Sequence, residues 1–215
     1  MRQIFVISMV TLLAMTTAMS GPQAKGQRQT DGLEGETLSM RSEIKVTDAL
    51  KQAALIQPVA LHRLKESVPE RIGKFTRSKL DGTRSQAGPA ALTQADAQFV
   101  DDQQRLLQLS LIDPGGIPPL GKSFLPQLEA GVRESFSRGY HEGVSIEGFP
   151  ATLEKLDAGQ SQTLQIMAGP RLRVTLTGYG VEAAELVELA GTLDLAALAA
   201  LAPETPPEID LGAKQ

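Results

Sequence analysis

Short segments in which apolar and polar residues alternate fill the second half of the chain. From Gly139 onward four such segments follow one another, and turns that contain glycine or proline separate them. The segments read "HEGVSIEG", "ATLEKLDA", "QTLQIMA" and "RLRVTLT". In the last of them one face would hold Leu172, Val174 and Leu176, and the other face Arg171, Arg173 and Thr175. Alternation with period two predicts β-strands, and one apolar face opposite one polar face is typical of an antiparallel sheet.

Two further alternating segments predict a hairpin before this run. They are "LTQADAQF" and "RLLQLSLI", and they flank the polar stretch "VDDQQ". The inward side chains would be Ala95, Ala97 and Phe99 on the first strand and Leu107, Leu109 and Leu111 on the second. Upstream, residues 73–82 ("GKFTRSKLDG") predict a strand that ends in a turn at Asp81 and Gly82.

Helical spacing occurs twice before these strands. Residues 46–58 predict a short helix that begins at Thr47 as the N-cap and stops at Pro58. A second short helix ends at Pro69, and its apolar face would consist of Leu61, Leu64 and Val68.

Helical spacing also occurs twice later in the chain. An amphipathic helix is predicted where apolar residues recur every four positions, at Phe124, Leu128, Val132 and Phe136. The terminal helix, "EAAELVELAG", would bury Val181, Leu186, Leu189 and Leu193. Asp194 is placed to cap a last short helical stretch.

The order of these elements predicts an α+β domain. Helices come first, and three strands, a helix, four strands and a final helix follow. Strands cluster instead of alternating with helices, which favours antiparallel pairing. We therefore expect a single antiparallel sheet of about six or seven strands packed with helices.

The N-terminus has the order of a secretory signal peptide. Arg2 precedes the apolar run "IFVISMVTLLAM", and the small and polar residues "TTAMSG" follow. The apolar run has about a dozen residues, whereas a bilayer-spanning helix needs roughly 20. We expect residues 1–20 to be removed by cleavage after Ser20, with Ala18 as the alternative, and the mature protein to be periplasmic or secreted. A retained membrane anchor is the competing interpretation.

The composition of the remaining chain separates a linker, a folded domain and a tail. Residues 21–45 are polar with scattered glycines and predict a flexible linker. Residues 203–215 contain three prolines, which predict a disordered tail. The folded domain would then span residues 46–202. Because the chain has no cysteine, a packed core must supply the stability that disulfides give many exported proteins.

The stretch "GYGVEA" (residues 178–183) matches the G-x-G-x-x-A turn that binds dinucleotides. Such a site also needs a second parallel strand after the helix, but here the helix leads into an alanine-rich stretch and a proline-rich tail. We interpret Gly178 and Gly180 as parts of a tight structural turn and expect no cofactor.

Few residues are available for catalysis. The chain has two histidines, His62 and His141, and no serine in a G-x-S-x-G motif. We therefore predict no catalytic or metal-binding residues and no enzyme. Carboxylates on neighbouring predicted strands leave a hydrolase as the weakest alternative, and they are Glu142, Glu147, Glu154 and Asp157.

Positive charge gathers in one stretch of an otherwise acidic chain. The net charge is −4, yet residues 63–84 hold seven Lys and Arg against three Asp and Glu. The candidate interaction patch consists of Arg71, Lys74, Arg77, Lys79 and Arg84. It could contact an anionic envelope component. The simpler interpretation is that these charges lie on an edge strand and keep it from pairing with other chains. Nucleic acid is not an expected partner, because the chain is acidic and only 4% aromatic.

Three stretches resemble landmarks of a group of secreted bacterial proteins of unknown function. They are "LHRLKESVPERIGKFTRSKLDG", "ADAQFVDDQQRLLQLSLIDPGG" and "RLRVTLTGYGVEAAELVELAGTLDLAAL". More distantly, the strands, the residues 144–151 and the final helix resemble the PsbP-like fold. That resemblance implies an antiparallel sheet packed with helices and an accessory or binding role without catalysis.

These observations favour an exported, non-catalytic accessory or binding protein of the cell envelope, with an unidentified envelope protein as partner. The alternative is a carrier of a small apolar ligand or lipid, held between the sheet and the predicted helix that ends at Phe136. After removal of the signal peptide we do not expect an integral membrane protein.

Overall fold

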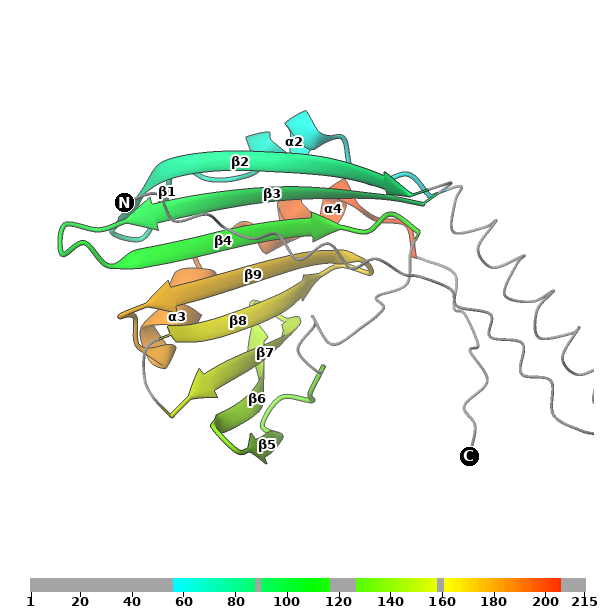
Figure 1. Ribbon diagram of the computed structural model, residues 1–215. Coiled ribbons are helices and arrows are strands. Elements are labelled where there is room, and N and C mark those ends of the chain that lie inside the picture. The colour runs from blue at the N-terminus through cyan, green and yellow to red at the C-terminus, as the bar shows by residue number, and fades with distance from the viewer. Residues whose placement is uncertain (1–55, 88–89, 117–126, 158–160, 206–215) are drawn as a thin grey trace, which may run out of the picture. The chain divides into compact units, whose positions relative to one another are not determined.

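The fold is an antiparallel sheet with short helices on one side (Figure 1). The computed structural model describes residues 56–87, 90–116, 127–157 and 161–205, all within the unit formed by residues 39–215. The first four strands are β1 (Arg71–Ile72), β2 (Phe75–Ala87), β3 (Ala90–Val100) and β4 (Leu106–Asp113). The other five are β5 (Arg133–Phe136), β6 (Gly139–Ile146), β7 (Phe149–Leu156), β8 (Ser161–Ala168) and β9 (Leu172–Tyr179). The helices are α2 (Leu61–Glu66), α3 (Ala183–Ala190) and α4 (Leu195–Leu201).

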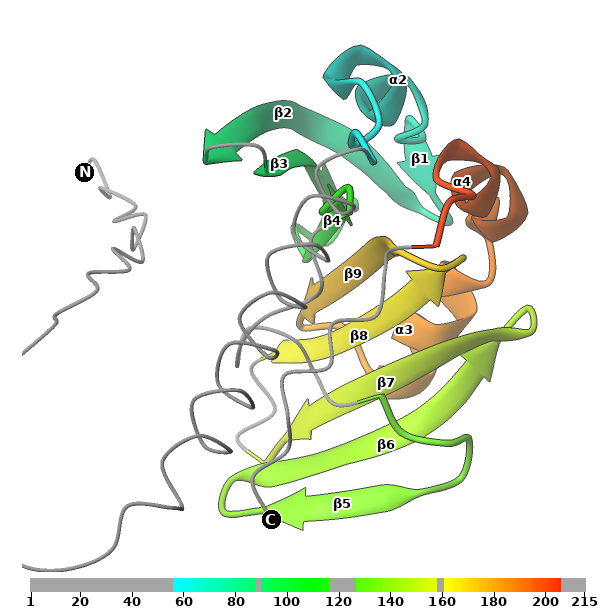
Figure 2. The ribbon, with the colours of Figure 1, turned by 90° about the vertical axis from the view of Figure 1, so that its right-hand side faces the viewer.

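The sheet consists of two meanders joined in the middle. Its strand order is β1-β2-β3-β4-β9-β8-β7-β6-β5, so sequence neighbours pair everywhere except where β4 pairs with β9. Figure 2 shows α2, α3 and α4 on the same side of the sheet. The helix α2 packs on β2 and β3, α3 on β8 and β9, and α4 on β8.

The predicted fold class is wrong. Nine strands, not six or seven, form the sheet in the described residues, and the helices there are few and short. Strands lie in two places where helix or turn was expected, in residues 81–87 and 133–136. The predicted helix at residues 46–58 lies almost wholly outside the described residues.

The two central hairpins follow the alternation of the sequence. Burial alternates residue by residue along β4 and β8, because every second side chain turns toward the helices. This inner face forms the core, and its side chains from the four central strands are Ala95, Ala97, Phe99, Leu107, Leu109, Leu111, Leu164, Ile166, Ala168, Leu172, Val174 and Leu176. The predicted inward residues of β3, β4 and β9 are thereby confirmed.

The expected turn at Asp81 and Gly82 is wrong, because β2 continues through both residues. Asp81 pairs with Asp96, and Gly82 pairs with Ala95 in the middle of the β2–β3 ladder. A Cβ atom at Gly82 would lie 2.7 Å from the Leu61 side chain. Glycine is needed here so that α2 can pack closely on the strand, not so that the chain can reverse.

The expected amphipathic helix at residues 124–136 is also wrong, although Phe124 lies outside the described residues. Gly131 has a φ of 88°, and Arg133–Phe136 form the edge strand β5, all of whose residues are exposed. Val132 and Phe136 are 41% and 37% exposed. A four-residue spacing is also a multiple of the strand period, so it did not distinguish a helix from a strand.

The terminal helices confirm their predicted core residues. The side chains of Val181, Leu186, Leu189 and Leu193 are buried. The Asp194 carboxylate accepts a hydrogen bond from the Ala197 backbone N–H and so caps α4. At the turn before α3, Gly180 has a φ of 70°, and a Cβ at Gly178 would lie 2.7 Å from Val181. The glycine pattern therefore has a structural reason.

An ion cluster fastens the β3–β4 turn to α3. The Arg105 guanidinium binds the Glu185 carboxylate through two nitrogens, at 2.8 and 3.0 Å, and also contacts Asp101. Hydrogen bonds from Arg105 and from Lys74 lower the pKa of Glu185. Burial would raise the pKa of Asp101, but hydrogen bonds from the Arg105 backbone and side chain outweigh it and lower the pKa.

The opposite end of the sheet contains a buried ion pair. Arg171 and Asp113, which are 4% and 0% exposed, approach to 3.3 Å. The Asp113 carboxylate also accepts hydrogen bonds from the backbone N–H groups of Val59, at 2.7 Å, and Gly115, at 2.8 Å. Arg171 reaches Glu204 beyond α4 as well.

The two arginines at the start of β9 were expected on the exposed polar face, and this expectation is wrong. Arg171 takes part in the buried ion pair. Arg173 is only 5% exposed, and its burial lowers its pKa to about 10.

Candidate ligand-binding cavity

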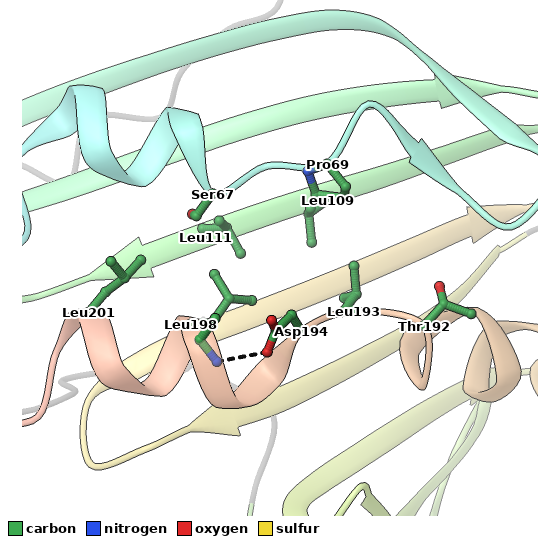
Figure 3. A pocket seen from close by; sticks show the side chains of 10 residues that line it. Ser67, Pro69, Leu109, Leu111, Thr192, Leu193, Asp194, Leu198 and Leu201 are labelled. Carbon is green, nitrogen blue, oxygen red and sulfur yellow. Dashed lines mark hydrogen bonds between the residues drawn. The ribbon is translucent and has the colours of Figure 1, made fainter.

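An apolar cavity of about 350 Å³ lies between the sheet and the helices (Figure 3). Leu109 and Leu111 of β4 form its floor. One wall is the segment between α2 and β1, with Ser67 and Pro69. The other wall is α4 with the loop before it, and it consists of Thr192, Leu193, Asp194, Ala197, Leu198 and Leu201. The two walls of the cavity therefore come from segments that are far apart in the sequence.

Local periodicity brings these side chains together. Leu109 and Leu111 are two residues apart on β4, so both face the helices. On α4 the lining positions recur three or four residues apart and therefore share one face of the helix. The floor leucines are 1% and 0% exposed, so the cavity is closed at its base, and it opens toward the half-buried or exposed residues Ser67, Pro69, Thr192 and Asp194, which we call the rim.

The few polar side chains at the rim have no free hydrogen-bond donor. The Ser67 hydroxyl donates to the Leu64 carbonyl oxygen at 2.7 Å, and the Thr192 hydroxyl donates to the Leu189 carbonyl oxygen at 2.7 Å. The Asp194 Oδ1 atom accepts from the Ala197 N–H at 2.9 Å. No lysine or arginine is among the lining residues of this cavity.

The wall formed by α4 is held at both ends. Before the helix, the Asp194 cap fixes its first turn. After the helix, the Glu204 carboxylate lies 3.1 Å from the Arg171 guanidinium. Glu204 is 60% exposed in its side chain, so this second contact is a weak restraint compared with the packing of Leu195 and Leu198.

The structure does not bring the candidate basic patch together on one face. In β2, Arg77 and Arg84 pair with the inward positions Phe99 and Thr93, whereas Lys79 pairs with Gln98 of the polar face. Most of the five charges have local partners. Lys74 binds Glu185, Lys79 binds Asp81, Arg84 donates to Gln57, and Arg77 donates to the carbonyl oxygens of Val68 and Pro69. Arg71 is exposed on β1.

The candidate hydrolytic carboxylates also diverge. Glu142 binds Arg133 at 2.8 Å on one face of the sheet, whereas Glu154 lies 3.6 Å from His141 on the other. Glu147 follows β6 with a positive φ of 50°, and Asp157 follows β7. Within the described residues no three metal-ligating side chains converge. No helix in that part of the chain is long and apolar enough to cross a membrane.

The glycine turn lies outside the cavity and in a setting unlike that of a dinucleotide site. The strand before it, β9, is antiparallel to both of its neighbours, β4 and β8. The carbonyl oxygen of Gly180 accepts a hydrogen bond from the Arg105 side chain, which comes from the β3–β4 turn.

No protein-family model matches the chain, and neither a curated protein nor a solved structure does. The resemblance to secreted bacterial proteins and to PsbP-like domains therefore stays a prediction. The alternative placed an apolar ligand against the helix predicted to end at Phe136, but that segment ends in the edge strand β5, and the cavity lies between β4 and α4 instead. The sequence marked Leu109, Leu111 and Leu193 as core residues, and nothing in their spacing distinguishes a filled core from one with a gap.

Proposed function

We propose that this protein is a non-catalytic binding protein whose cavity holds a small apolar ligand. The observation that carries the proposal is the cavity between β4 and α4, which is lined mainly by leucine, alanine and proline side chains. Ligand sites in proteins begin at about 300 Å³ and are mostly apolar with a few polar groups. The cavity meets both conditions.

The volume limits the size of the ligand. An apolar cavity of about 150 Å³ takes up benzene. A space of about 350 Å³ would then hold roughly a dozen non-hydrogen atoms. At about 0.5 kcal/mol per atom, such a ligand would bind with a dissociation constant on the order of 10–100 μM. A ten-carbon chain with a small headgroup is therefore a suitable probe.

Filling the cavity is expected to abolish binding. Ala197 lines the cavity, so the added ring in Ala197→Phe would occupy the ligand's space. We expect calorimetric titration with decylamine, 1-decanol and decanoate to show binding of at least one probe to the native protein, and a loss of at least about tenfold in the variant.

The matched control is Ala200→Phe, which places the same ring on the same helix at a position that, unlike Ala197, does not line the cavity; both alanines are exposed. It should bind like the native protein. If none of the three probes binds the native protein, or if both variants bind equally well, the proposal is wrong.

We also propose that the protein acts outside the cytoplasm. The support is the charged, apolar and small-residue order of residues 1–20. We expect the mature protein to begin at Gly21 or Met19 and to be released from cells by osmotic shock. N-terminal sequencing of the purified protein checks this, and a membrane-bound protein with residues 1–20 intact would contradict it.

A further inference from the structure

The polar side chains among the residues that line the cavity offer hydrogen-bond acceptors and no free donor. Both hydroxyl groups there, on Ser67 and Thr192, direct their hydrogen atoms to backbone carbonyl oxygens. Each hydroxyl oxygen keeps lone pairs that can accept a further hydrogen bond. The third polar group is the Asp194 carboxylate, which can only accept when ionised.

The Asp194 carboxylate retains capacity for a ligand. Its Oδ1 atom caps α4 through the Ala197 N–H, and Oδ2 has no hydrogen-bond partner among the described residues. Asp194 is exposed at the rim, beside Leu193 and Leu198 of the cavity wall (Figure 3). A ligand whose apolar part lies against these leucines would bring its polar end to this carboxylate.

We infer that the cavity selects amphiphiles whose headgroup donates hydrogen bonds, with an alkylammonium favoured over an alcohol and an alcohol favoured over a carboxylate. A carboxylate headgroup would meet acceptors only and would be repelled by Asp194. An alcohol can donate once to the rim. An ammonium can donate up to three times and adds the attraction of its positive charge. This inference rests on the proposed function, because it assumes that the cavity is where the ligand binds.

One charge opposes this preference. Arg77 reaches the wall that faces Asp194, where its Nη1 atom donates to the carbonyl oxygens of Val68 and Pro69. Both the guanidinium and the Asp194 carboxylate are partly exposed, so solvent screens each of them. We therefore expect a preference of about five- to tenfold between ammonium and alcohol, not a larger one.

The three decyl probes test the inference with one chain length. Calorimetry on the full native protein at neutral pH and low salt should rank decylamine above 1-decanol and 1-decanol above decanoate. Decanoate that binds as tightly as decylamine would overturn the inference while leaving the proposed function intact. Absence of binding by all three probes would instead overturn the proposed function.

Asp194→Asn isolates the charge. Asparagine is as good an N-cap as aspartate, so α4 should keep its first turn and the melting temperature should change little. The affinity for decylamine should fall about fivefold, whereas that for 1-decanol should stay the same. Asp81→Asn removes the same charge from the opposite face of the sheet and should change neither affinity. Equal decylamine affinity in Asp194→Asn and the native protein would contradict the inference.

Discussion

Replacing Asp113 with alanine is expected to lower the free energy of unfolding by about 3–5 kcal/mol. The substitution leaves the buried Arg171 guanidinium without its buried counter-ion, and it leaves the Val59 and Gly115 N–H groups without their acceptor. Because Asp113 joins the start of the described chain to β4 and β9, the loss should destabilise the whole domain. Urea denaturation followed by circular dichroism measures it.

Two further variants make this result specific. Asp81→Ala breaks the exposed ion pair with Lys79 and should leave the midpoint of urea denaturation nearly unchanged. The double variant Asp113→Leu with Arg171→Met removes both buried charges, and it should recover part of the stability lost in Asp113→Ala. A loss in Asp113→Ala as small as that in Asp81→Ala would show that the ion pair does not hold this end of the core together.

Replacing Leu189 with alanine should cost about 2–4 kcal/mol. Leu189 is 7% exposed, and its Cδ2 atom lies only 2.6 Å from where a Cβ of Gly73 would be, so α3 packs tightly on the turn between β1 and β2. The change would leave a gap between these elements. For a domain of this size the melting temperature should fall by roughly 5–15 °C, which differential scanning calorimetry can measure.

The control for this prediction is Glu188→Ala, one residue earlier on the exposed side of α3. It should change the free energy of unfolding by no more than about 0.5 kcal/mol. If the two substitutions lower the melting temperature equally, α3 does not close the core.

Sequence alone predicted the elements in which one local pattern dominates. The alternation of Leu107, Leu109 and Leu111 predicts a half-buried strand, and the structure confirms it. The same holds for the terminal helix and for the Asp194 cap, since a cap depends on residues only three positions apart. In these places local preference and tertiary packing agree.

The sequence failed where a residue's role depends on a distant partner. Glycine is typical of turns, but at Gly82 the absence of a side chain leaves room for Leu61 of α2 to pack on the strand. The spacing around Arg171 predicts an exposed strand residue. Arg171 is buried instead, where it pairs with Asp113, 58 positions earlier in the chain. The cavity is the extreme case, because it depends on how closely α4 approaches β4, and no single segment encodes that distance.

The strand order leaves one edge of β4 without its partner until late in synthesis. The strand β4 is complete long before β9, which is the last strand of the sheet to leave the ribosome. At roughly 5–20 residues per second, the β4 edge waits several seconds for its partner. During that interval the nascent chain presents an unpaired strand whose inner face is leucine-rich, the kind of edge that pairs with other chains. For a chain that folds as it is synthesised, the rate of translation therefore sets how long this edge of β4 stays unpaired.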